Sequence, residues 1–251
     1  MSSPNNCRPA WFRSTAWITI SLIALVLSSG PTQATIILPT NNSFESPYLG
    51  SNNVASITTP TGWSTAGSYP SYILINDANN GRIPAGQGKD GEQYMQFSAV
   101  NAGANGLMSQ IIPSGTALIQ DGMVYSLTTG VGYDATGGYA SYGATLDLLA
   151  WNGSTATLLT SRSVSSNAVN AAPDFILPYS TTNWNSTGSA LIGQQLMIRL
   201  TAIYPPTVNS LTIFDNAFIT AGNATPEPST VVLFGLGGWL VWRRRRTGIR
   251  H

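Results

Sequence analysis

Apolar and polar residues alternate along the middle of the chain, and this alternation predicts β-strands. Between Met123 and Val131 the larger side chains mostly stand at every second position and alternate with Val124, Ser126, Thr128 and Gly130. This two-residue period is typical of a strand that has one buried face. The stretch from Leu196 to Ala202 repeats the pattern, with Arg199 on the opposite face. A third case runs from Ala144 to Ala150, where Asp147 points away from the apolar side chains. We therefore expect three half-buried strands here.

Shorter β-prone runs separated by turn residues occupy the rest of the central region. Further strands are expected near 72–75, 92–98, 107–112, 155–163, 173–179 and 210–220. Asn152-Gly153 lies between two such runs and predicts a hairpin of 143–151 with 155–163. No stretch between 35 and 220 keeps a helical period. The pattern predicts an all-β fold, a two-sheet antiparallel jelly-roll sandwich over 35–220.

The two ends of the chain carry apolar runs of a different kind. Arg8 and Arg13 precede an eleven-residue run from Trp17 to Leu27, and small residues lead up to Ala34. This order predicts a helical secretory signal, residues 1–34, that signal peptidase removes. An uncleaved anchor is the alternative, although eleven helical residues span only about 16 Å of a bilayer core of ~30 Å.

The other apolar run follows a proline-rich motif. In order, the chain carries Pro226, Glu227 and Pro228, an apolar run from Thr230 to Trp242, and then Arg243, Arg244, Arg245 and Arg246. This order resembles the PEP-CTERM sorting signal of Gram-negative bacteria, which an exosortase reads. We expect 221–229 to be a linker and 230–251 to be a short membrane helix with an arginine-rich tail. Clustered arginines stay on the cytoplasmic side, which places the main domain across the inner membrane.

Charge and reactive residues exclude several functions for the exported part. Between Thr35 and Thr225 there are nine acids and four bases, a net charge of 4 − 9 = −5, which does not suit nucleic acid. The single cysteine, Cys7, precedes the signal run, and the single histidine, His251, is the last residue. The exported part therefore has no disulfide, no Ser-His-Asp triad and no imidazole ligands for a metal.

Six short motifs follow one another along 41–220. They are Asn42-Ser43-Phe44-Glu45, Pro60-Thr61-Gly62-Trp63, the run from Gly88 to Met95, Ser109-Gln110-Ile111-Ile112, the run from Asp121 to Leu127, and Phe214-Asp215-Asn216-Ala217-Phe218. In this order they resemble the jelly-roll carbohydrate-binding modules of xylanases and related galactose-binding-like sandwiches. The resemblance implies that the first and last motifs lie side by side. It also implies a structural calcium held by Glu45 and Asp215.

The alternation around Asp215 leaves two orientations open. Asp215 shares its phase with Ile213 and Ala217, which turns the carboxylate inward, where it needs a metal, a cation or several hydrogen bonds. If Phe214 and Phe218 mark the inward face instead, Asp215 is solvated and needs no calcium.

Three tyrosines are the candidate sugar-binding residues. Tyr133, Tyr139 and Tyr142 flank Gly137-Gly138, with Asp134 among them. Aromatic faces stack on sugar rings, so these residues could form a binding rim. Exposed hairpin aromatics without a ligand are the alternative.

Together these features predict an exported, non-enzymatic cell-surface or matrix protein. PEP-CTERM proteins are associated with exopolysaccharide and biofilm matrix, so the resemblance implies that this protein binds or associates with exopolysaccharide. A structural surface or biofilm protein without a sugar site is the second possibility. A carboxylate-based glycan hydrolase is the third, although none of the acids is paired in a recognisable catalytic motif.

Overall fold

The computed structural model describes the central part of the chain. The described residues are 34–49, 55–56, 58–66, 71–76, 91–99, 105–113, 117–133, 141–167, 175–203 and 210–224. All of them belong to a compact unit that starts at Ala34. The expected signal helix and the C-terminal membrane helix lie outside these residues. Inside them, no helix is long and apolar enough to cross a bilayer.

The regular secondary structure of the described residues consists of β-strands joined by turns and loops. The strands are β1 (Thr35–Ile37), β2 (Ala55–Ser56), β3 (Ser64–Ala66), β4 (Ser71–Asn76), β5 (Gln93–Ala99), β6 (Gly106–Ile111), β7 (Met123–Tyr133), β8 (Ser141–Trp151), β9 (Ala156–Asn167), β10 (Phe175–Ser180), β11 (Trp184–Asn185), β12 (Gln195–Ala202) and β13 (Ser210–Asn223). Every strand expected from the sequence is confirmed. The four that the sequence did not reveal, β1, β2, β3 and β11, are two or three residues long, too short for a period to show.

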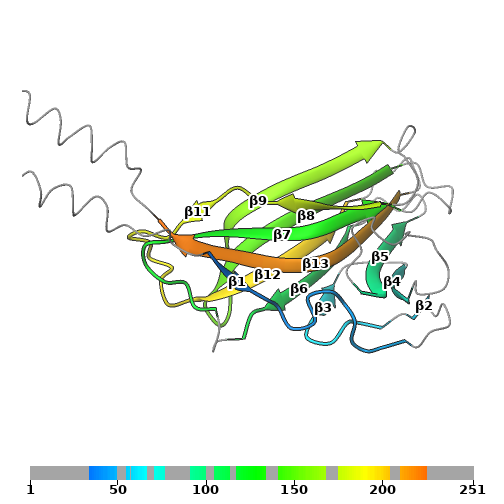
Figure 1. Ribbon diagram of the computed structural model, residues 1–251, viewed down its shortest axis with the longest axis horizontal. Helices are drawn as coiled ribbons and strands as arrows, with labels where there is room; N and C mark the ends of the chain where they lie inside the picture. The colour runs from blue at the N-terminus through cyan, green and yellow to red at the C-terminus, as the bar shows by residue number, and fades with distance from the viewer. Residues whose placement is uncertain are drawn as a thin grey trace, which may run out of the picture. The chain divides into compact units, whose positions relative to one another are not determined.

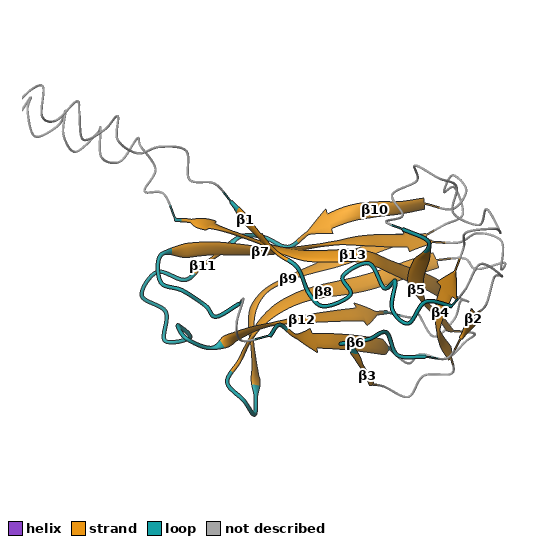
Figure 2. Cartoon of the chain, turned by 60° about the horizontal axis from the view of Figure 1, so that its bottom comes forward, coloured by secondary structure: helices purple, strands orange, loops and turns teal. Residues whose placement is uncertain are grey.

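The strands form the predicted two-layer antiparallel sandwich (Figures 1 and 2). Sheet I has the order β2-β4-β5-β13-β7, with β10 and β11 on the free edge of β7 and β1 beside the end of β13. Sheet II has the order β9-β8-β12-β6-β3. A single parallel bridge between Ser210 and Ser141 joins the two layers.

The predicted hairpin is the connection between β8 and β9. Asn152 holds its turn, because the side-chain Oδ1 accepts the N–H groups of Ser154 at 2.9 Å and Thr155 at 2.8 Å. An asparagine side chain that bonds the backbone two residues on is a common turn device. The hairpin is therefore confirmed, with a turn of residues 152–155.

The main core lies between the sheets and uses alternate residues of the long strands, as the sequence predicts. Sheet II contributes Ala144, Leu146, Leu148, Ala150, Leu196, Ile198, Leu200 and Ala202. Sheet I contributes residues such as Met95, Leu127, Val131 and Phe214. A smaller buried cluster on the outer side of sheet I consists of Ile75, Tyr94, Ile176, Leu211 and Ile213. Sheet I is therefore apolar on both faces near the start of β13.

The opening segment closes one side of the sandwich. Phe44 is fully buried and its ring lies 5.2 Å from that of Trp63. Gln93 on β5 donates from Nε2 to the Phe44 carbonyl at 2.9 Å, and Gln110 on β6 donates to the Thr40 carbonyl at 3.0 Å. One amide from each sheet therefore anchors the same segment over the core.

The opposite side is closed by contacts between β9 and residues 179–182. Thr160 donates a hydrogen bond to the Thr182 carbonyl at 3.0 Å. Arg162 donates to the Ser180 carbonyl at 2.8 Å, and its guanidinium lies 5.2 Å from the centre of the Tyr179 ring. These contacts tie the edge of sheet II to the edge of sheet I.

Tyr125 lies where the end of the core meets a connecting segment. Burial raises the pKa of the Tyr125 phenol, because the charged form would lose its hydration, and the hydrogen bond from the Gln120 N–H acts in the opposite direction. Its ring also packs against Trp184, with 6.0 Å between centroids. The buried phenol therefore stays protonated and positions the segment that leads into β7.

Candidate functional site

The first and last motifs of the domain lie side by side, as the resemblance implies. The Asn42 carbonyl accepts the Ala217 N–H at 2.9 Å. The Asn42 side chain donates to Asn216 Oδ1 at 3.2 Å. The two side chains are 174 residues apart in the sequence. These bonds bring the segments that contain Glu45 and Asp215 into contact.

Glu45 serves as an acceptor for a tight turn. Its Oε1 accepts the N–H groups of Glu92 at 2.9 Å and Gln93 at 2.7 Å. Gly91, with a φ of +78°, passes directly beneath this carboxylate. A neighbouring hydroxyl, that of Tyr48, donates to Glu92 Oε2 at 3.0 Å. The Glu45 carboxylate is therefore positioned by backbone donors, with a second carboxylate nearby.

Asp215 is fully buried, and a β-bulge next to it decides which face of sheet I it occupies. The register of β13 against β7 shifts between Asp215 and Phe218, and Asn216 at the shift has a φ of +46°. A bulge inserts a residue and reverses which face the following side chains occupy. Phe214 before the bulge and Ala217 after it both face the main core. Asp215 therefore shares the outer face of sheet I with Ile213. Phe214 faces the main core, as one of the two expected orientations has it, and Asp215 is buried, as the other has it.

Carboxylate oxygens are the ligands that a hard cation such as Ca²⁺ prefers. In the described part of the chain, no group of three or more His, Cys, Asp and Glu residues could hold a metal. A calcium at this place would therefore take its remaining ligands from oxygens such as main-chain carbonyls, as Ca²⁺ commonly does. Glu45 and Asp215 would supply the charge. The buried Asp215 carboxylate accepts the Asn216 N–H at Oδ1, at 2.8 Å, so the backbone supplies part of the compensation that a buried charge needs.

The three candidate tyrosines fall largely outside the described structure. Tyr139 lies outside the described residues altogether. The backbone of Tyr133, at the end of β7, pairs with Phe175 on β10, and that of Tyr142 on β8 pairs with Ser166 on β9. Their side chains are not described, so the sugar-binding rim stays a prediction. The sorting motif at 226–228 and the four arginines at 243–246 also lie outside the described residues.

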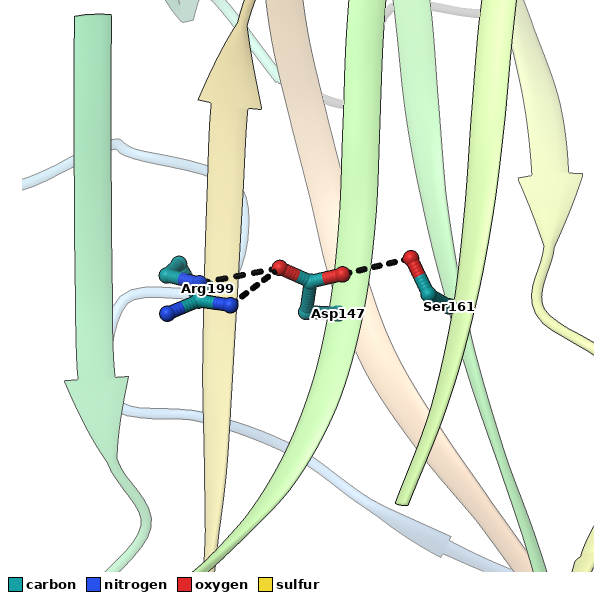
Figure 3. Close-up of polar contacts among 3 residues, drawn as sticks. All are labelled: Asp147, Ser161 and Arg199. Carbon is teal, nitrogen blue, oxygen red and sulfur yellow. Dashed lines mark hydrogen bonds and ion pairs between the residues drawn. The ribbon is translucent and has the colours of Figure 1, made fainter. Parts of the chain in front are cut away.

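A polar row on the outer face of sheet II was missed by the sequence analysis (Figure 3). Arg199 Nε donates to Asp147 Oδ2 at 2.9 Å, and Arg199 Nη2 lies 2.7 Å from the same oxygen. Ser161 Oγ donates to Asp147 Oδ1 at 2.6 Å. The three residues come from neighbouring strands β12, β8 and β9, where they lie directly opposite one another. The alternation places Asp147 and Arg199 on the outer face, but only the register pairs them.

The Asp147–Arg199 pair combines a buried anion with an accessible cation. The Asp147 side chain is only 7% exposed, whereas that of Arg199 is 35% exposed. Because Nε and Nη2 both contact Asp147 Oδ2, the guanidinium is fixed beside the carboxylate while part of the Arg199 side chain stays exposed. The arrangement presents fixed N–H donors on a strand surface that also carries hydroxyl groups.

Comparison with known proteins finds matches for the C-terminal tail and for the sandwich domain. The PEP-CTERM protein-sorting motif matches residues 224–246, which confirms the resemblance of the tail and indicates export and cell-surface sorting in Gram-negative bacteria, with processing by an exosortase. None of the curated proteins compared with the chain matches it in sequence.

Solved structures share the sandwich. A Stig cyclase, Fisc, from Fischerella sp. TAU, in complex with (3Z)-3-(1-methyl-2-pyrrolidinylidene)-3H-indole, is 22% identical at a TM-score of 0.61, and the match covers 77% of this chain and 100% of that chain. The apo form of a cyclase from Fischerella sp. is 21% identical at a TM-score of 0.59, covering 77% and 98%. β-Sandwich carbohydrate-binding modules are more distant, at 9% identity, a TM-score of 0.39 and coverage of 68% and 62%.

At these identities the cyclase matches show a common fold. The family described as HpiC1 cyclase (HpiC1-like) matches residues 35–219, which span the sandwich from β1 into β13. Over this region the chain belongs to the HpiC1-like family.

Proposed function

We propose that this protein is an exported, non-enzymatic sandwich that associates with exopolysaccharide at the cell surface or in the matrix. Signal peptidase and an exosortase process it, and its tail holds it at the inner membrane before the cut at Pro226-Glu227-Pro228. One observation carries the proposal: the sorting motif begins at Ala224, the residue directly after the last strand of the sandwich. The sorting tail thus follows the whole HpiC1-like domain and directs it to the cell surface.

The outer face of sheet II supports a glycan-binding role. Planar donors beside hydroxyls and an aromatic ring suit sugars, which combine hydrogen-bonding edges with apolar faces. Arg199 supplies fixed donors and Ser161 a hydroxyl, while Trp151 lies on the same outer face two residues along β8 from Leu149. The tyrosines at 133, 139 and 142 are the second proposed binding region.

A glycan array tests the function directly. The full chain in detergent should be retained on acidic or neutral bacterial exopolysaccharides. The double variant Asp147→Leu/Arg199→Met should lose retention by the sheet II face, and the triple variant Tyr133→Ala/Tyr139→Ala/Tyr142→Ala should lose retention by the tyrosine rim. If the unaltered chain binds no glycan on the array, the binding role is rejected and a structural surface protein is favoured.

We also propose that Glu45 and Asp215 hold a structural calcium. If they do, a chelator lowers the melting temperature of the unaltered chain, because a ligand that binds only the folded state stabilises it. Added calcium, but not magnesium, restores the original value, since Mg²⁺ demands a stricter geometry. The Glu45→Gln variant should no longer respond. An unchanged melting temperature, with no ion found in the protein, would remove the proposal.

Membership of the HpiC1-like family favours one second candidate, an activity on a small indole compound. The Fisc structure from Fischerella sp. TAU contains such a compound, and the fold is shared. A thermal shift with 4-(1H-indol-3-yl)butan-2-one, present in another cyclase structure from that source, separates the candidates. If the indole compound raises the melting temperature and no glycan binds, the enzymatic candidate replaces the non-enzymatic proposal. A two-carboxylate hydrolase is less well supported, because Asp147 and Asp215 lie on the outer faces of different sheets.

A further inference from the structure

The outer face of sheet II carries two apolar rows, of which the proposed glycan-binding region uses only Trp151. Residues directly opposite in a sheet share a face, so the register defines each row. The first row crosses four strands as Leu158, Leu149, Met197 and Ile111. The second contains Ala156, Trp151, Gln195 and Leu118. Seven of these eight side chains are apolar, and we call them the apolar rows.

The apolar rows are accessible to an external partner. Leu158 is 53% exposed, Leu118 is 43% exposed and Ile111 is 39% exposed. Leu149 is buried yet belongs to neither core cluster of the described residues, which agrees with its place among outward-facing neighbours. Contiguous exposed apolar residues on a soluble domain usually mark an interaction surface.

The face changes character along the strands. Beyond the apolar rows lies the polar row of Ser161, Asp147 and Arg199, and one step further lie Ser163, Thr145 and Thr201. One half of the face is therefore apolar and the other half polar.

The apolar half lies at the end of the sandwich where the tail begins. Leu118 bridges to Gln195, and four residues later Gly122 accepts the Ala224 N–H at 2.8 Å. The end of β13 and the start of β12 lie towards the same end of the sandwich in Figures 1 and 2. The five residues 225–229 separate Ala224 from the apolar run of the tail. Fully extended, they reach only about 17 Å, so a tail in the membrane keeps this end close to the lipid.

We infer that the apolar rows of sheet II rest on the lipid bilayer while the tail holds the protein there. This inference depends on the membrane-held stage of the proposed function. Tethering makes a weak second contact effective, because the local concentration of bilayer is high. The net charge of −5 between Thr35 and Thr225 gives no attraction to anionic lipid, so apolar contact drives docking. The polar half of the face stays in water and remains available to a glycan.

Single-cysteine labelling tests this orientation. Cys7 is the only cysteine, so Cys7→Ser leaves a chain without thiols. Leu158→Cys and Ser163→Cys then give a matched pair, since both positions are exposed and face outward on β9. Each full chain, purified from the inner membrane of a Gram-negative host and labelled with an environment-sensitive dye, is reconstituted into vesicles of phosphatidylethanolamine and phosphatidylglycerol.

The dye at position 158 should shift to the blue, brighten severalfold and be quenched by nitroxide-labelled lipid, independently of salt. The dye at position 163 should keep its emission in water. Equal emission at both positions on vesicles that float with the protein overturns the docking inference alone. A shift at 158 without quenching by lipid also overturns it, because a second copy or another ligand then covers the rows. Failure of the protein to float with vesicles overturns the membrane-held stage as well.

Discussion

Gly91→Ala is expected to lower the free energy of unfolding by about 2–4 kcal/mol, because it strains the backbone and displaces a carboxylate that accepts two backbone hydrogen bonds. A Cβ at this position would collide with the Glu45 carboxylate, whose Cδ would lie 2.7 Å away. The φ of +78° disfavours alanine in addition. If Glu45 moves aside, the N–H groups of Glu92 and Gln93 lose their acceptor.

Gly122→Ala is the matched control for this prediction. Gly122 also has a positive φ, +69°, but nothing lies within 4 Å of an added Cβ. Backbone strain alone should therefore cost about 1–2 kcal/mol. Urea denaturation of both variants measures the difference. Equal losses would show that Glu45 is not held over Gly91 in solution. If calcium binds at Glu45, only the Gly91 variant should also lose its response to a chelator.

Asp147→Ala is the second substitution with a large expected effect. It leaves the Arg199 guanidinium against the sheet without its anion and removes the acceptor of Ser161. Breaking a buried ion pair costs about 3–5 kcal/mol, but the exposed edge of Arg199 regains some hydration, so we expect about 1–3 kcal/mol. Urea denaturation again provides the measurement.

Replacing both partners should cost less than replacing one. Asp147→Leu/Arg199→Met puts apolar side chains beside Leu149 and Met197, and apolar replacement of a buried pair is often neutral or stabilising. The double variant should therefore unfold at a higher urea concentration than Asp147→Ala. A double variant less stable than the single one would mean that the pair itself stabilises the fold. With the fold intact, loss of glycan retention in this variant reports on binding alone.

The period-two stretches show how far local pattern reaches. Ala144 to Ala150 and Leu196 to Ala202 have the faces that the alternation predicts, since a side chain on a pleated strand can point only two ways. Asn152 supplies a turn through its own side chain, so the hairpin needs no distant partner. The short strands β1 and β3 carry no such signal and exist because longer strands pair with them.

The candidate site was only partly accessible to such reasoning. Glu45 and Asp215 were singled out through the resemblance of whole motifs, and the structure brings their segments together through Asn42. The Asp147–Arg199 pair could not be found, because 52 residues separate the partners and their pairing depends on which strands become neighbours. The tyrosine rim remains a prediction.

Residue pattern alone established the all-β class, the faces of the long strands and the lack of histidine and cysteine between Thr35 and Thr225, because each follows from composition or short-range periodicity. The sorting tail was identified through the resemblance of a short linear motif. Tertiary structure decided the bulge at Asp215, which reverses the face of the last strand, and the register that aligns Leu158 with Leu149 and Met197. Both depend on hydrogen bonding between distant strands, whose choice of partner and offset minimises the energy of the whole sandwich rather than of any one segment.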